Sequence, residues 1–216
     1  MKYEFLLDLR VDKDTIWKDY AGIYTLIPGS NPERNTKYSK FKNNGSIYLS
    51  GNKYLRFSST VTLNSSNKWT ISVWSYRNNL YTNYSAILAD EDYNYTLQTY
   101  DSSYSDRIGC RINDSGYTIY SNTMHPINEW VHIALVNNPD NDTFSLYMNG
   151  IKQKQMSCIS MQFNYIGHSN YNEFVLLDDL CIVKDVLWTK NFELPNKYLN
   201  DYLNPPQIIY YNLKTT

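Results

Sequence analysis

Residues 129–155 have the sequence EWVHIALVNNPDNDTFSLYMNGIKQKQ, and this stretch decides the fold. Residues 130–136 alternate between two faces that are both largely apolar, which predicts a central strand covered on both sides. Asn149-Gly150 separates the β-rich runs 143–148 and 151–155. This dipeptide favours a tight hairpin, because both central residues of the turn need a positive φ. The stretch contains no obvious nucleophile, no metal-ligand cluster and no phosphate loop, so it predicts scaffold rather than chemistry.

Similar short runs recur along the whole chain, separated by polar turns, and no long helical period is present. The pattern predicts an all-β, antiparallel two-sheet sandwich or jelly roll. A short helix is predicted at 195–203, with Pro195 early in its first turn. The other predicted strands lie within residues 3–10, 45–59, 68–77, 84–90, 95–100, 106–114, 116–122 and 173–188.

The composition argues against several classes of partner. The 216 residues carry a formal net charge of −1, and the basic residues are spread along the chain, which gives no grip for nucleic acid. The chain has 22 Tyr and only 8 Gly. The fold must therefore use tyrosine as apolar mass with a polar tip. Nucleotide bias in the source genome accounts for much of this Tyr and Asn content, and a surface suited to sugars is the alternative.

The cysteine count and the first ten residues predict a protein without a disulfide framework and without a signal peptide. Cys110, Cys158 and Cys181 are odd in number and lie in strand-like segments, where free cysteine behaves as a small buried hydrophobe. Residues 1–10 have an apolar run of only three residues flanked by acids, so we expect no signal peptide. No apolar run approaches the length of a membrane span.

The order of the segments resembles the laminin G-like, or concanavalin A-like lectin/glucanase, sandwich family over roughly residues 3–203. The resemblance is carried by the run Ser46–Gly51, the tryptophan strand Thr70–Trp74, the Trp-His segment Trp130–Leu135, the hairpin Leu146–Gly150, the pair Asp178-Asp179 before Leu180, and the exit Trp188, Thr189, Phe192 and Pro195. It implies a concanavalin A-like jelly roll as the fold.

The closing sequence is similar to such domains in bacteriophage structural proteins. We therefore expect one domain over 1–203 and a tail over 204–216 that adds an edge strand or docks elsewhere. The chain departs from the family in two places. Phe174 and Val175 replace the usual Gly before the Asp-Asp strand, and Cys181 replaces the usual Arg.

Enzymatic chemistry is not expected. Some members of the family are glycosidases, and hydrolysis of a glycosidic bond needs two carboxylates across that bond. The chain has no Glu-x-Asp-x-Glu run on one strand, and consecutive Asp90-Glu91-Asp92 places its side chains on alternate faces. His132 is expected to be a core histidine, and no catalytic triad is indicated by local sequence.

No cofactor is required by these motifs, and calcium is the candidate metal that the resemblance implies at the rim of the sandwich. Loop carboxylates are the hard ligands that Ca²⁺ prefers. The alternative is that these acids are ordinary solvated turn residues. The candidate ligands are Asp90, Asp92, Asp178 and Asp179.

Sugar recognition would use aromatic faces for stacking and planar amides for hydroxyl groups. The loops 77–85 and 164–174 offer both kinds of group. Trp74 and Tyr76 have the polar parity of their strand and would line a concave face. The candidate ligand-binding residues are Trp74, Tyr76, Tyr81, Tyr84, His168, Asn170 and Tyr171.

Two functions follow as hypotheses. The first is a non-enzymatic bacteriophage virion protein, a capsid-decorating or fibre-associated subunit. It would assemble as a homo-oligomer with other virion subunits and bind a cell-surface glycan, without binding nucleic acid or inserting into a membrane. Its location would be the phage particle, after synthesis in the host cytoplasm. The alternative is a free-standing carbohydrate-binding module or lectin.

Overall fold

Residues 129–155 fold as β12 (Trp130–Asn138), β13 (Thr143–Met148) and β14 (Ile151–Met156), three neighbouring antiparallel strands of one sheet. The computed structural model describes residues 2–11, 18–30, 32–41, 45–77, 85–98, 106–112, 117–168 and 172–205. The expected central strand is confirmed, because every residue of β12 except Trp130 is buried. Asn149 and Gly150 have positive φ values of 48° and 76°, as the turn requires.

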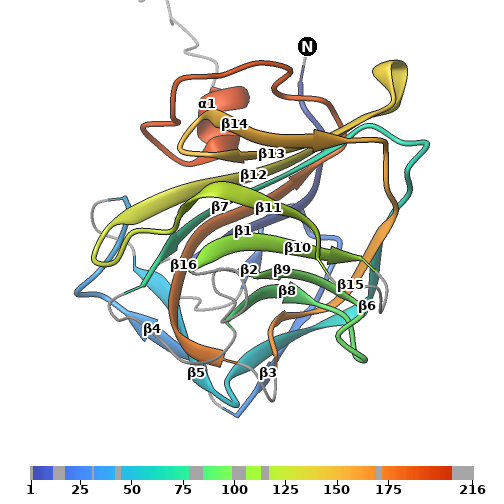
Figure 1. The fold of residues 1–216 in the computed structure, drawn as a ribbon. Coiled ribbons are helices and arrows are strands. Elements are labelled where there is room, and N and C mark those ends of the chain that lie inside the picture. Colours follow the sequence, from blue (N-terminus) through green and yellow to red (C-terminus); the bar gives the residue numbers. More distant parts are fainter. Residues whose placement is uncertain are drawn as a thin grey trace, which may run out of the picture.

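The described strands form two antiparallel sheets, which confirms the sandwich (Figure 1). The larger sheet has nine strands. Along its main path it continues from β12 through β7 (Trp69–Tyr76), β16 (Asn172–Val183), β1 (Phe5–Arg10) and β2 (Lys18–Asp19). The long strand β16 also pairs with β5 (Ser46–Gly51), which in turn pairs with β4 (Glu33–Asn35).

The second sheet has seven strands and includes the predicted pairs around 90 and 115. Residues 113–116, which were expected to form the turn of the second pair, lie outside the described residues. The strand order is β11 (Tyr117–Met124), β10 (Arg107–Ile112), β9 (Tyr95–Gln98), β8 (Ala86–Ala89), β15 (Met161–Gly167), β6 (Tyr54–Leu63) and β3 (Leu26–Gly29).

The apolar core fills the space between the two sheets. Ile71 and Val73 of β7 and Ile133 of β12 lie in one buried cluster with Phe163 of β15 and Leu88 of β8. These side chains alternate along each strand with residues of the opposite face, so period-two patterning places them all in the core. Burial of this apolar surface is the main favourable contribution to folding.

Part of the outer face of the nine-stranded sheet is covered by residues 184–203, which we call the covering segment. It runs above β12, β13 and β14 and carries α1 (Leu199–Leu203) (Figure 1). A second apolar cluster forms beneath it, in which Ala134 and Tyr147 pack against Trp188 and Phe192. The rings of Trp188 and Phe192 stack with their centroids 3.9 Å apart. The sheet is therefore apolar on both faces here, as β12 predicts.

The predicted C-terminal helix is shorter than expected. It begins at Leu199, so the expectation of a helix over 195–203 with Pro195 in its first turn is wrong. Tyr198 adopts an extended conformation and packs on Phe41 with ring centroids 4.8 Å apart, which fixes the chain before the helix starts. Among the described residues, no helix is long and apolar enough to cross a bilayer. Residues 206–216 lie outside the described residues.

Candidate functional site

Trp74 and Tyr76 lie on the outer face of the nine-stranded sheet, but other parts of the chain cover them. Trp74 is only 1% exposed. The Nζ atom of Lys40 lies 3.6 Å from the centre of its ring, and Phe41 packs edge-on against it. Tyr76 stacks on Tyr38 with centroids 5.1 Å apart. The expectation that these two rings line an open face is wrong, because the loop between β4 and β5 folds over them.

Asp178 and Asp179 are also inside the protein rather than at its rim. Both are nearly inaccessible, at 2% and 1% exposure. Asp179 has a positive φ of 50° at an irregularity in β16, so the two carboxylates follow each other without normal strand alternation. Burial raises the pKa of Asp178 to about 7 and that of Asp179 to about 8. The expectation that these two carboxylates lie at the rim of the sandwich is therefore wrong, because both are buried.

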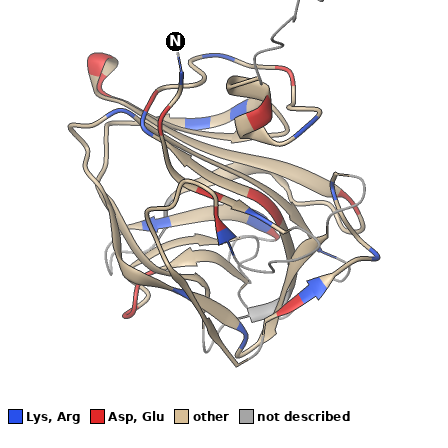
Figure 2. Cartoon of the chain, turned by 180° about the vertical axis from the view of Figure 1, so that it is seen from behind, with Lys and Arg blue, Asp and Glu red and all other residues tan. Residues whose placement is uncertain are grey.

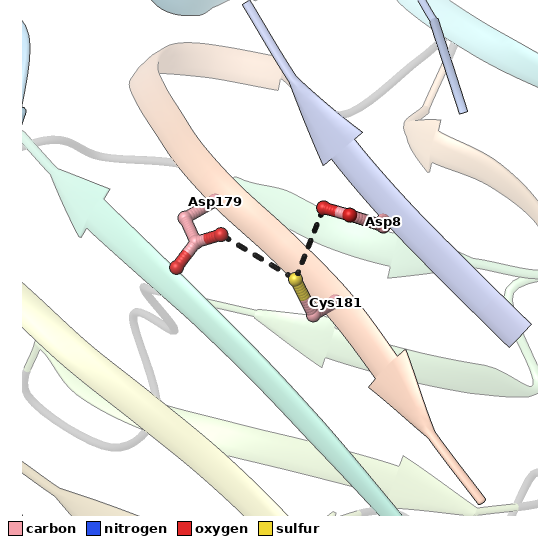
Figure 3. Close-up of side chains that lie close together, drawn as sticks. All are labelled: Asp8, Asp179 and Cys181. Atoms are coloured by element: carbon pink, nitrogen blue, oxygen red, sulfur yellow. Dashed lines mark hydrogen bonds between the residues drawn. The ribbon is translucent and has the colours of Figure 1, made fainter. Parts of the chain in front are cut away.

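Asp8, Asp179 and Cys181 form a buried cluster whose ligand atoms lie within 4.8 Å of one another (Figure 3). Arg10 donates to both carboxylate oxygens of Asp8 at 3.0 Å, and the side chain of Asn200 donates to one of them at 2.7 Å. The backbone N–H of Leu199 and the thiol of Cys181 donate to the two oxygens of Asp179.

Every carboxylate oxygen of this cluster therefore has a donor inside the protein. Burial raises the pKa of the Cys181 thiol, whereas a metal ligand must be a thiolate. A cation at this place would have to displace the Arg10 guanidinium. We conclude that the cluster joins β1, β16 and α1 structurally.

Three of the other predicted residues, Asp90, Asp92 and His168, lie at or beside the turn between β8 and β9. The structure brings His168, at the end of β15, against Tyr93 of this turn, with ring centroids 4.9 Å apart. Asp90 is buried and accepts the backbone N–H of Tyr95 at 2.9 Å, whereas Asp92 is exposed. Burial lowers the pKa of His168. Calcium at Asp90 and Asp92 stays a prediction. Four predicted residues lie outside the described residues: Tyr81, Tyr84, Asn170 and Tyr171.

A polar pocket that the sequence did not indicate opens on the outer face of the nine-stranded sheet. Its volume is about 190 Å³, and we call it the Trp188 pocket. Val136, Ser145 and Gln155 lie side by side on β12, β13 and β14 and form its floor. Residues opposite one another in adjacent antiparallel strands point to the same face, which explains this row.

The walls of the Trp188 pocket come from the covering segment, from β14 and from the residues around η2. Trp188 and Thr189 belong to the covering segment, and Lys152 to β14. The Lys152 ammonium donates to the side chain of Gln155 and to the carbonyl of Thr189, both at 3.0 Å, and so ties the segment to the sheet. Three more residues complete the lining, at or beside the 3₁₀ turn η2 (Pro139–Asn141): Asn138, Asn141 and Thr143.

A second pocket, of about 360 Å³, lies between the β6–β7 loop and β1. Its apolar lining is Leu6, Leu63 and Trp69, and its charged lining is Lys68 and Lys184. We call it the lysine pocket. Thr62, Asn64 and Asn67 add a hydroxyl and two amides.

Sequence comparison assigns the family. A family model described as the concanavalin A-like lectin/glucanase superfamily matches residues 49–185. The chain belongs to this superfamily. A comparison with curated protein sequences gave no significant match. The family assignment confirms the resemblance that the segment order indicates.

Solved structures agree with this superfamily fold. The binding domain of Paraclostridial Mosquitocidal Protein 1 has a TM-score of 0.64 and 18% identity over 86% of this chain and 50% of that chain. The binding domain of botulinum neurotoxin serotype G has a TM-score of 0.58 and 19% identity over 85% and 48%. The chain thus spans about half the length of these two toxin domains.

A third solved structure matches this superfamily member along its whole length. It is domain 4 of a GH43 extracellular arabinanase from Geobacillus stearothermophilus, in complex with arabinotriose. Its TM-score is 0.62 at 16% identity, over 94% of this chain and 100% of that domain. At such identities these likenesses show the fold alone.

The charges of this concanavalin A-like chain also bear on its chemistry. Figure 2 shows Lys and Arg interspersed with Asp and Glu over the strands and loops. Neither of the two pockets has an Asp or Glu in its lining, although both contain lysine, hydroxyl and amide groups. The lining of each pocket can thus donate hydrogen bonds and pack against apolar surface, but it offers no carboxylate for general acid or base chemistry.

Proposed function

We propose that this protein is a non-catalytic, lectin-like domain that binds a saccharide in the Trp188 pocket. The observation that carries the proposal is the lining of that pocket. It combines one indole with hydroxyl, amide and ammonium groups from three strands and the covering segment. Binding sites for small molecules usually pair apolar or aromatic surface with a few convergent polar groups.

Each part of the pocket suits one feature of a sugar. The Trp188 ring is stacked on Phe192 and held at a fixed angle, so it can act as a rigid platform for the C–H face of a pyranose or furanose ring. Ser145, Gln155 and Asn141 can donate and accept hydrogen bonds, as sugar hydroxyls do. Lys152 adds a donor that is already directed towards Gln155.

The absence of carboxylates from the pocket lining supports binding without hydrolysis. Retaining and inverting glycosidases both place two carboxyl groups on either side of the bond that they cleave. No Asp or Glu lines the Trp188 pocket. Asp178 and Asp179 are a pair of consecutive carboxyl groups, but both are buried and accept hydrogen bonds from backbone N–H groups inside the protein.

The relatives support a binding function. Two of the similar structures are binding domains of toxins, and a third is an arabinanase domain in complex with arabinotriose. We extend to this chain only the general idea of a saccharide or receptor ligand.

The proposed setting is a bacteriophage particle, in which the domain is a capsid-decorating or fibre-associated subunit, in homo-oligomers, facing a cell-surface glycan. Support comes from the closing motif, in which Trp188, Thr189, Phe192 and Pro195 belong to the covering segment. The alternative is a free-standing carbohydrate-binding module. Light scattering distinguishes them, since a symmetric oligomer favours the virion subunit and a strict monomer with glycan affinity favours the module.

The binding proposal is tested by affinity electrophoresis in gels that contain arabinan, xylan, galactan or glucan, followed by calorimetry with the best oligosaccharide. We expect Trp188→Ala to abolish retardation, and Gln155→Ala and Asn141→Ala to weaken it about tenfold or more. Tyr202→Ala is the matched control, because Tyr202 is an exposed aromatic outside both pockets, at 46% exposure. The proposal fails if no saccharide is bound, or if folded pocket variants bind as well as the wild type.

A further inference from the structure

The lysine pocket is the larger of the two pockets and is built from fixed parts. The side-chain amide of Asn137 donates to the carbonyls of Ser65 and Asn67, both at 2.9 Å. The N–H of Ser65 donates to the hydroxyl of Ser160 at 2.9 Å. The Trp69 indole donates to the Asn64 carbonyl at 3.1 Å. The loop that forms one wall is thus preorganised, which lowers the entropic cost of binding a ligand.

The charge of the lysine pocket has one sign. Lys68 and Lys184 line it, and no Asp or Glu does. Their salt-bridge partners, Asp140 and Glu4, stand outside the lining with side chains 62% and 68% exposed. Exposed ion pairs contribute little to stability, so an incoming anion can replace these carboxylates at small cost. The pocket therefore favours a ligand group with negative charge.

The two pockets share the covering segment, which contributes a lining residue to each, and an ion pair joins a lining residue of the lysine pocket to η2. Lys184 belongs to the lysine pocket and Trp188 to the other, and four residues of fully extended chain span at most about 14 Å. On the opposite side, Asn138 and Asn141 flank the Trp188 pocket, while Asp140 between them pairs with Lys68. A saccharide of a few units can therefore contact both pockets across η2.

We propose that the lysine pocket is a subsite for an acidic sugar unit, carrying carboxylate or sulfate, of the saccharide whose neighbouring unit lies against Trp188. This inference rests on the proposed function and names its ligand class. The anion lies between Lys68 and Lys184, and the amides of Asn64 and Asn67 bind the ring hydroxyls. Leu63 and Leu6 contact the apolar edge of the ring.

Calorimetry with matched acidic and neutral ligands tests the subsite. Tetragalacturonate is compared with its methyl ester, and a carrageenan tetrasaccharide with its desulfated form, so that the two sources of charge are separated. The full chain is used as wild type, as Lys68→Gln/Lys184→Gln and as the control Lys154→Gln/Lys197→Gln. The control removes the same charge from exposed lysines outside both pockets. Each measurement is repeated at high salt.

We expect at least one acidic ligand to bind about tenfold or more tightly than its neutral form, and this preference to disappear in the Lys68→Gln/Lys184→Gln variant but not in the control. High salt should lower the affinity of the acidic ligand and leave that of the neutral ligand unchanged. The ligand that shows the preference identifies the charge as carboxylate or sulfate. If the acidic and neutral forms bind equally well and Trp188→Ala still abolishes their binding, the subsite is overturned but the proposed function stands. Binding of neither form overturns the subsite, and the proposed function fails with it only if none of the arabinan, xylan, galactan and glucan ligands binds either.

Discussion

At the residue scale, the most informative groups are polar atoms buried on the outer face of the nine-stranded sheet. Trp74 Nε1, His132 Nδ1 and Asp178 Oδ1 are buried without a hydrogen-bond partner among the described residues. The ring centroids of Trp74 and His132 are 5.0 Å apart, and Asp178 pairs with Trp74 in the register of β7 and β16. Unpaired buried polar groups are costly, so this region opposes folding more than an apolar one would.

Asp178 predicts a pH dependence of stability. Its pKa rises from 3.8 to about 7 in the folded state, so the folded protein holds this proton more tightly than the unfolded chain. Its contribution to the free energy of unfolding is fully present below pH 3.8 and is lost as the pH rises to about 7. Asp178→Asn should therefore gain stability over the wild type progressively across this window and keep a constant advantage above it.

Urea unfolding of both proteins from about pH 4 to about pH 8 measures this difference. The contributions of buried His132 and His125 to the free energy of unfolding change with pH in the opposite direction, because burial lowers their pKa values to about 3 and about 4. The comparison between the two proteins is therefore more decisive than either profile alone. Asp92→Asn, at an exposed position, is the control. A stability difference that does not change with pH would contradict the assignment.

At the element scale, the hairpin turn between β13 and β14 supports the covering segment. The carbonyl of Gly150 accepts the N–H of Phe192 at 2.9 Å. A Cβ atom at Gly150 would lie 2.2 Å from the carbonyl oxygen of Phe192. Asn149 also ties the turn to β12, since its side chain accepts the N–H of His132 at 2.9 Å. The turn thus has a second role besides joining two strands, which is to dock the segment that carries Trp188.

Gly150→Ala should be more harmful than the matched change Gly51→Ala. Both residues have a positive φ, at 76° and 61°, but a Cβ at Gly51 meets nothing within 4 Å. Gly51→Ala should cost about 1–2 kcal/mol for its left-handed backbone alone. Gly150→Ala should cost at least about 3 kcal/mol, because the clash must also displace Phe192.

Urea denaturation gives both free energies, and calorimetry with the bound saccharide gives the effect on the Trp188 pocket. Gly150→Ala should also weaken binding, because Phe192 supports the Trp188 ring. Gly51→Ala should leave binding unchanged. Equal losses of stability in the two variants would show that the covering segment does not depend on the turn.

At the scale of the whole molecule, the two pockets are connected through the covering segment and the Lys68–Asp140 ion pair, and both offer cations, amides and hydroxyls to a ligand. No carboxylate lines either pocket. The proposed function predicts binding with no chemical change in the ligand, whereas hydrolysis would need a pair of carboxyl groups at the bond that breaks.

Prolonged incubation with every saccharide that the protein binds should release no reducing ends, while the same ligands raise the midpoint of thermal unfolding. Reducing-end assays and thermal melts on one preparation measure the two outcomes together. Turnover that disappears after a single Asp or Glu substitution would show that an acidic pair exists, and would make the protein an enzyme.

The sequence by itself determined the strands and the sandwich. Alternation in β12 and the Asn149-Gly150 turn depend only on residues close together in the chain, so local physics was sufficient to predict them. The segment order also predicted the superfamily. The same local reasoning placed Trp74 and Tyr76 on the correct face of their strand.

Only the tertiary structure decided what covers that face and where a hollow remains. Lys40 and Phe41 close over Trp74, and Trp188 completes a pocket with Ser145 and Gln155, although no pattern in the sequence links these positions. The helix starts at Leu199 because of contacts with β16, not because of Pro195. The parity of a strand fixes which side chains point outward, but segments distant in the chain determine whether those side chains meet water or protein.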